Sequence, residues 1–106
     1  RIITAQQLGT REKGWASVAG VVLVRQRPGT ASGIVFITLE DETGIVNLIV
    51  RPDIYERHRA VARHAALLRA DGYVERKGQV IHLMVKRLVD LSELLSGYAF
   101  KSRDFH

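Results

Sequence analysis

The segment VFITLEDETGIVNLIV, residues 35–50, constrains the fold of this chain more than any other part of it. Two runs of β-branched and apolar residues, 34–40 and 45–51, flank the short acidic turn DETG. Gly44 ends that turn, and glycine adopts the left-handed backbone conformation that short hairpin loops use at little energetic cost. The segment therefore predicts a β-hairpin with one buried face.

Three more strands and a helix are predicted around this hairpin. Residues 17–27, 67–76 and 80–88 are rich in β-branched and apolar side chains, whereas residues 28–33 and 77–79 are loops by composition. Gly20, inside the long first strand, indicates a bulge or a bend. Pro52 opens a stretch of helical apolar spacing that continues to Ala65 and predicts one helix. Two further short helices are expected at residues 4–8 and 90–95.

The order of these elements is typical of one fold. A single helix stands between the third and fourth of five strands, as in the five-stranded Greek-key barrel called the OB-fold. We therefore expect an all-β barrel with one or two short helices, and a small α+β sandwich is the alternative. Residues 16–89 would form the barrel, residues 1–15 a linker or the end of a preceding domain, and residues 90–106 a terminal helix and tail. Arg1 at the first position indicates a fragment of a longer chain.

The alternation of side chains along each strand separates its two faces. In the hairpin, the uniformly apolar sets must point into the barrel, because a one-residue slip would expose all of them. These inward residues are Val35, Ile37, Leu39, Val46, Leu48 and Val50. The outer face of the hairpin then carries Phe36, Thr38, Asn47 and Arg51. In the first strand, the same alternation directs Val22 and Val24 inward, and Leu23, Arg25 and Arg27 outward.

The charge of the chain favours an anionic partner. Sixteen Lys and Arg residues stand against 11 Asp and Glu residues, a net charge of +5, which favours nucleic acid first. OB-folds bind oligonucleotides on the face of the second and third strands, and an exposed ring there can stack on unpaired bases. Trp15, Tyr73 and Tyr98 are expected to be packing residues. The residues expected to bind nucleic acid are Phe36, Thr38, Asn47 and Arg51 on the face, and Arg25, Arg27, Arg76 and Lys77 near the loops.

Other classes of function are disfavoured. The chain has no cysteine, its four histidines lack metal-ligand spacing, and no glycine-rich phosphate-binding motif is present. No apolar run approaches the ~20 residues that span a membrane. We therefore expect a binding module and not an enzyme, with no cofactor, metal, small-molecule substrate or membrane contact, in the cytoplasm.

The run VAGVVLVRQRPGTASGIVFITLEDETGIVNLIVRPDIYER closely resembles the C-terminal region of bacterial error-prone DNA polymerases, the DnaE-type ImuC group of C-family replicases. The last four residues, RDFH, look like the terminal signature of the same group. The resemblance covers residues 18–106 and implies an OB-fold that engages single-stranded template DNA. The parent it implies acts in SOS-induced mutagenesis and translesion synthesis with the partner ImuB and the accessory protein ImuA. The catalytic aspartates of that family lie in its palm domain, so no acidic residue here is assigned that role.

A second resemblance is to the anticodon-binding barrel of aspartyl and lysyl tRNA synthetases. In that family a phenylalanine on the second strand stacks on an anticodon base, and Phe36 matches it within VFITLED. Asn47 stands where aspartyl enzymes carry a base-reading glutamine, so the amide is kept but shortened. Three hypotheses remain open: binding of single-stranded DNA; docking to ImuB or another polymerase domain, with the tail of residues 98–106 in contact; and binding of RNA.

Overall fold

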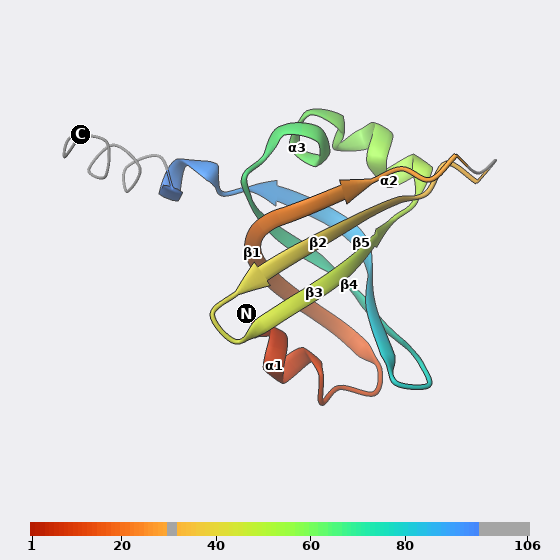
Figure 1. The fold of residues 1–106 in the computed structure, drawn as a ribbon, viewed down its shortest axis with the longest axis vertical. Coiled ribbons are helices and arrows are strands. Elements are labelled where there is room, and N and C mark those ends of the chain that lie inside the picture. Colours follow the sequence, from red (N-terminus) through yellow and green to blue (C-terminus); the bar gives the residue numbers. More distant parts are fainter. Residues whose placement is uncertain (30–31, 96–106) are drawn as a thin grey trace.

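The structure, a computed structural model, describes residues 1–29 and 32–95. Its strands are β1 (Gly14–Gln26), β2 (Val35–Asp41), β3 (Gly44–Val50), β4 (Leu67–Lys77) and β5 (Val80–Asp90). They close into a barrel in the order β1-β2-β3-β5-β4, in which only β3 and β5 are parallel (Figure 1). The five-stranded OB-fold barrel predicted from the sequence is confirmed.

Helices close the two ends of the barrel (Figure 1). At one end lies α1 (Ala5–Leu8), and at the other end lie α2 (Pro52–Arg57) and α3 (Arg59–His64). The helical segment predicted between the third and fourth strands is present, but it is divided in two, because His58, with φ −117° and ψ 34°, leaves the helical conformation and separates α2 from α3. The break lets the buried residues Ile54 and Tyr55 of α2 and Ala62 of α3 all pack on the barrel end.

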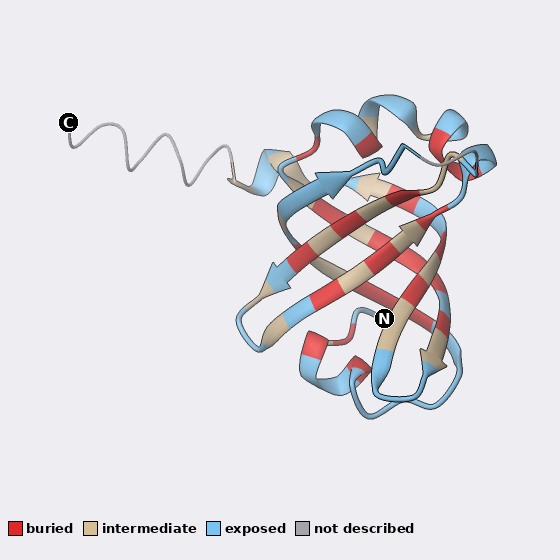
Figure 2. Ribbon diagram, turned by 45° about the vertical axis from the view of Figure 1, so that its right-hand side comes forward, coloured by how far each residue is buried: buried red, intermediate tan, exposed pale blue. Residues whose placement is uncertain are grey.

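The inward sets predicted for the hairpin are confirmed. All six residues, Val35, Ile37, Leu39, Val46, Leu48 and Val50, are buried. Figure 2 shows the alternation of buried and less buried positions along β2 and β3. Fully buried Val18, Leu68 and Leu83 from β1, β4 and β5 complete the core, so the barrel interior is filled by side chains and leaves the outer face for binding.

A β-bulge in β1 changes the faces of its last residues. Val22 pairs with Leu39, but Val24 pairs with Thr38, so Leu23 is an extra residue. Val24 therefore lies on the outer face, 43% exposed, and its predicted inward position is wrong. Arg25 takes the inward phase opposite Ile37, which corrects its predicted outward position. The alternation of inward and outward side chains along a strand does not reveal an inserted residue.

Gly20 marks the place where β1 changes partner, and it is not the bulge itself. Val21 pairs with Leu67 of β4 on one side and with Glu40 of β2 on the other. A Cβ atom on Gly20 would lie 2.6 Å from the carbonyl oxygen of Glu40. Only glycine lets the two backbones approach this closely, so the bend predicted from Gly20 has a steric cause.

The acidic turn of the hairpin anchors α1. Asp41 Oδ2 accepts a hydrogen bond from the backbone N–H of Ala5 at 2.7 Å, and Oδ1 accepts from the N–H groups of Thr43 and Gly44. Burial acts to raise the pKa of Asp41, but a hydrogen bond from the Thr43 hydroxyl, together with the three from backbone N–H groups, outweighs it and holds the pKa below its ordinary value. Asp41 thus joins the first turn of α1 to the end of the hairpin.

Candidate nucleic-acid interface

The outer face of β2 and β3 presents the aromatic ring and the amide singled out from the sequence. Phe36 pairs with Ile49, and Thr38 pairs with Asn47, and all four side chains are half-buried. The Oγ1 of Thr38 donates a hydrogen bond to Oδ1 of Asn47 at 3.3 Å. The NH₂ group of Asn47 therefore keeps its donors for a ligand, because no acceptor contacts it within the described residues.

Phe36 belongs to a longer apolar row that crosses four further positions on the barrel. Ile49 pairs with Met84, Met84 with Tyr73, and Tyr73 with Trp15. We call the residues Phe36, Ile49, Met84, Tyr73 and Trp15 the apolar row. All five lie on the outer surface. Three of them are half-buried and two are exposed, so the row is an accessible apolar stripe.

The far end of the apolar row is an aromatic pair. Trp15 and Tyr73 pack edge to face, with ring centroids 5.0 Å apart and an interplanar angle of 85°. The two rings therefore pack on each other, as the sequence predicts, and each is also 49% exposed, so the pair is accessible on the surface. Tyr98, also predicted to pack, lies outside the described residues. The outward phases of Tyr73 and Met84 were readable from the sequence, but their pairing with the hairpin was not.

A polar row lies beside the apolar one. Asn47 pairs with His82 across the parallel β3–β5 contact, and His82 pairs with Glu75 of β4. The Nδ1 atom of His82 is buried and has no hydrogen-bond partner. We call the residues Thr38, Asn47, His82 and Glu75 the polar row. Sequence reasoning missed His82, because only the non-local register of β3 and β5 places it next to Asn47.

The basic residues predicted to bind nucleic acid do not gather at one place on the barrel. Arg51 is exposed at the end of β3, beside the hairpin face. Arg76 donates from Nη2 to the carbonyl oxygens of Gly9 and Arg11, at 2.8 and 3.1 Å, and so holds the segment between α1 and β1. Lys77, the last residue of β4, is exposed. The turn that follows it, between β4 and β5, lies at the end of the barrel opposite to α2 (Figure 1).

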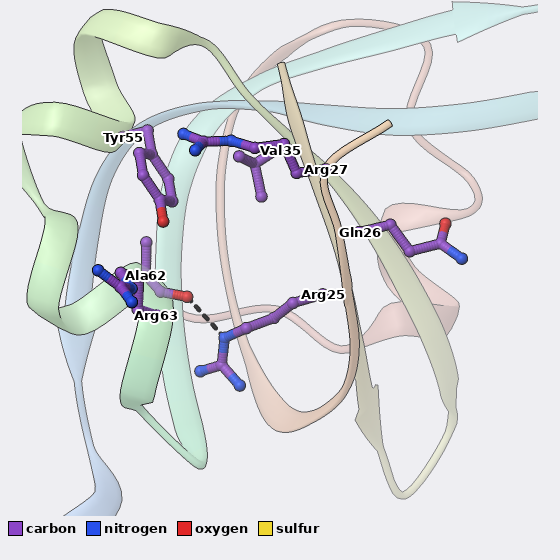
Figure 3. Close-up of a pocket in the computed structure, with 7 residues that line it drawn as sticks. All are labelled: Arg25, Gln26, Arg27, Val35, Tyr55, Ala62 and Arg63. Atoms are coloured by element: carbon purple, nitrogen blue, oxygen red, sulfur yellow. Dashed lines mark hydrogen bonds between the residues drawn. The ribbon is translucent and has the colours of Figure 1, made fainter. Parts of the chain in front are cut away.

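Arg25 and Arg27 turn toward the helices and away from the hairpin face. The Nε atom of Arg25 donates to the carbonyl oxygen of Ala62 at 2.6 Å, and Nη2 donates to that of Ala65. Burial lowers the pKa of Arg25 below its ordinary value. The guanidinium of Arg27 lies 4.4 Å from the ring centroid of Tyr55. These two arginines therefore line a pocket at the end of the barrel, as Figure 3 shows.

One carboxylate elsewhere on the barrel has a structural role. Asp71, 2% exposed, accepts hydrogen bonds from Nε of Arg69 and Nε of Arg87, each at 3.0 Å. Burial acts to raise the pKa of Asp71, but hydrogen bonds from Ser17, Arg69 and Arg87 outweigh it and lower the pKa. This cluster ties β4 to β5.

Metal-dependent chemistry has no visible ligand set in the described part of the chain. Within residues 1–29 and 32–95, no three His, Asp or Glu side chains gather closely enough to hold a metal ion. In the same residues, no helix combines the length and apolarity needed to cross a membrane. What the outer face offers is an apolar row for stacking and a polar row for hydrogen bonding.

Comparison with known proteins identifies the family of the barrel. The model of the tRNA anti-codon family, described as an OB-fold nucleic acid binding domain, matches residues 16–91. Error-prone DNA polymerase 2 of Rhizobium meliloti is 47% identical over 99% of this chain and 10% of its own length. An error-prone DNA polymerase of Anaeromyxobacter dehalogenans is 51% identical over 100% of this chain and 9% of its own length. The chain thus spans about a tenth of the length of these curated relatives.

Solved structures share the fold at low sequence identity. The asparaginyl-tRNA synthetase from Pyrococcus horikoshii complexed with asparaginyl-adenylate aligns with a TM-score of 0.67 and 19% identity. The alignment covers 84% of this chain and 22% of that chain. At this identity the similarity concerns the barrel alone.

Proposed function

Because this chain belongs to the tRNA anti-codon family of OB-fold nucleic acid binding domains, we propose that the outer face of β2 and β3 binds single-stranded DNA. The observation that carries the proposal is the accessible Phe36 ring beside the free amide donors of Asn47. Stacking of a base on an aromatic side chain contributes about 1–3 kcal/mol and tolerates any base. Phe36 is the stacking residue in this proposal.

The polar side chains around Phe36 have distinct proposed roles. Asn47 donates to a base edge or a phosphate, and Thr38 holds the Asn47 amide in that orientation. Arg51, exposed at the end of β3, neutralises a phosphate on the same side. Lys77 attracts the strand electrostatically from the other end of the barrel. Arg76, which holds the α1–β1 segment, contributes charge more than direct contacts.

The apolar row extends the proposed binding track beyond the hairpin. Neighbouring strands lie ~4.8 Å apart, so three strand steps carry the row roughly 14 Å from Phe36 to Tyr73. Ile49 and Met84 offer flat apolar contact along the way, and the Trp15–Tyr73 pair offers a second stacking surface. A strand of several nucleotides can therefore follow the row around the barrel.

The parent protein is inferred from the relatives. We infer that it is an error-prone DNA polymerase of the ImuC group, acting in the cytoplasm in SOS mutagenesis and translesion synthesis, with ImuB as a partner. In that parent, residues 16–89 form the nucleic-acid-binding module, flanked by a linker at residues 1–15 and a tail at residues 90–106. The module binds template and leaves the chemistry to other domains.

Anisotropy of a labelled oligothymidylate tests the binding proposal. Affinity should fall steeply with salt concentration, and Phe36→Ala should weaken binding by about 1–3 kcal/mol. Leu23→Ala is the matched control, since it removes an apolar side chain that is 49% exposed at the β1 bulge, off both rows. Equal affinity of the Phe36→Ala variant and the wild type would refute the platform. Tighter binding of an RNA oligomer of the same sequence would instead favour the RNA alternative.

Protein docking is the second candidate function. The observation that favours it is the Trp15–Tyr73 pair, because exposed aromatic side chains are enriched at protein interfaces. The tail of residues 98–106, which the sequence suggested as a contact, lies outside the described residues. A pull-down with ImuB that is lost in Tyr73→Ala, without any change in oligonucleotide affinity, would favour docking.

A further inference from the structure

A pocket of about 200 Å³ lies between the end of β1 and the two helices α2 and α3. Its lining residues are Arg25, Gln26, Arg27, Val35, Tyr55, Ala62 and Arg63 (Figure 3). Three of these seven side chains are arginines. They come from two elements, since Arg25 and Arg27 belong to the end of β1 and its loop, and Arg63 to the last turn of α3.

The positive charge of the pocket has no counter-charge in direct contact. Within the described residues, none of the three arginines has a carboxylate within ion-pair distance. The acidic residue that acts on Arg25 is Asp90, whose Oδ1 accepts a hydrogen bond from the backbone N–H of Ser92. Like charges gathered without a partner repel one another, so the pocket is prepared for an anion.

Two of the groups around the pocket are held in place before any ligand arrives. Arg25 is fixed by the carbonyl oxygens of Ala62 and Ala65, which use two of its five N–H donors and leave the others free. Arg27 is held over the Tyr55 ring. Figure 3 shows the Tyr55 hydroxyl pointing toward Ala62 and Arg63, and this hydroxyl has no hydrogen-bond partner among the described residues.

The size of the pocket selects among anions. Sites for drug-sized ligands are ~300–1,000 Å³, so a pocket of about 200 Å³ has room for a small group and not for a whole nucleotide. Guanidinium groups match the oxygens of phosphate in geometry and charge. We propose that the pocket formed by Arg25, Arg27, Arg63 and Tyr55 binds one phosphate group.

The position of the pocket connects it to the proposed DNA track, and this step rests on the proposed function. Gln26, the last residue of β1, lies between Arg25 and Arg27 and pairs with Phe36. A DNA strand whose base stacks on Phe36 of β2 therefore lies one β-strand away from the pocket at the end of β1. The phosphate can come from within such a strand, from its terminus, or from solution, and all three have the same chemistry.

Titration with inorganic phosphate at constant ionic strength tests the pocket directly. Amide resonances of residues 25–27 and 62–63 should shift in a saturable way in NMR spectra. Arg63→Gln and Arg27→Gln should each weaken phosphate binding about tenfold, as expected for loss of a charge-assisted hydrogen bond. Arg57→Gln is the control, because it removes an exposed charge from α2 outside the pocket. Arg25 is left intact in these variants, since its loss would also release α3.

The outcomes separate the pocket from the DNA track. Absence of saturable shifts, or equal weakening by Arg57→Gln, would overturn the phosphate site. Phe36→Ala should leave phosphate binding unchanged, so the pocket can stand even where the track fails. Oligonucleotides with a 5′-phosphate and with a 5′-hydroxyl then identify the source. A preference for the phosphorylated strand that Arg63→Gln abolishes indicates a terminal phosphate. Equal weakening of both strands by Arg63→Gln indicates an internal one, and no effect on either strand indicates free phosphate.

Discussion

Thr38 donates a hydrogen bond to Asn47 across the hairpin, from Oγ1 to Oδ1 at 3.3 Å, and this contact decides which end of the amide faces a ligand. Since the oxygen is engaged, the NH₂ group is the exposed end. The outer face thus presents donors beside the Phe36 ring, a combination suited to an anionic strand with stacked bases.

Asn47→Asp should weaken binding of single-stranded DNA by about 1–2 kcal/mol, measured by anisotropy at neutral pH. The substitution keeps the side-chain shape, removes both N–H donors and adds a negative charge that repels phosphate. Leu94→Asp, which adds the same charge at an exposed position at the end of the described chain, should have little effect. An equal loss in both variants would reduce the role of Asn47 to net charge.

Tyr73→Ala should weaken the binding of long oligonucleotides and leave that of short ones unchanged. A short strand held at Phe36 does not reach the Trp15–Tyr73 pair, which lies three strand steps away around the barrel. Affinities for a series of oligothymidylates of increasing length measure the effect. The matched control is Val80→Ala, which shortens an exposed side chain at the start of β5. A loss that is the same at every length would place Tyr73 outside an extended track.

Gly20→Ala should lower the free energy of unfolding by about 1–3 kcal/mol, measured by urea denaturation. The added Cβ would lie 2.6 Å from the backbone oxygen of Glu40, and a backbone atom can move only if the strands separate. Gly29→Ala is the matched control, because no atom lies within 4 Å of its added Cβ. Equal stability of the two variants would show that β1 and β2 can separate at this point at little cost.

The hairpin could be read from the sequence almost completely, and the reason is its local pairing. Alternation has a period of two, and a turn of fixed length sets the register, so the faces of Phe36 and Asn47 followed directly. The end of β1 could not be read in this way. A bulge at Leu23 reversed the faces of Val24 and Arg25, and an inserted residue leaves no mark on composition.

The rest of the candidate interface could not be predicted, because it is formed by residues that lie far apart in the sequence. His82 lies beside Asn47 only because β3 and β5 pair in parallel, and Arg63 and Arg25 line one pocket because α3 packs against the end of β1. The sequence shows that Arg25 and Arg27 stand near a loop, but it does not show their partners. Arg25 donates to carbonyl oxygens at the end of α3, and Arg27 lies over the Tyr55 ring of α2. Tertiary packing, and not local pattern, decides such placements.

Asp71→Asn should lower the free energy of unfolding by about 1–3 kcal/mol at neutral pH, because Arg69 and Arg87 lose the carboxylate that both contact at 3.0 Å. The pH dependence should change as well. The pKa of Asp71 is lower in the folded state than its ordinary value of about 3.9, so the unfolded state binds the proton first. Its stabilising contribution is therefore complete above that ordinary value, and is lost as the pH falls through the lower, folded-state pKa.

Urea midpoints between neutral pH and pH 3 measure this contribution. Below the ordinary pKa of about 3.9, the wild type should lose stability on acidification more steeply than Asp71→Asn, so the two curves should approach each other toward the acid end. Asp53→Asn, which removes an exposed carboxylate in the first turn of α2, is the control for the loss of one negative charge. Parallel curves for the wild type and Asp71→Asn would show that the carboxylate holds β4 to β5 without any difference in protonation between the folded and unfolded states.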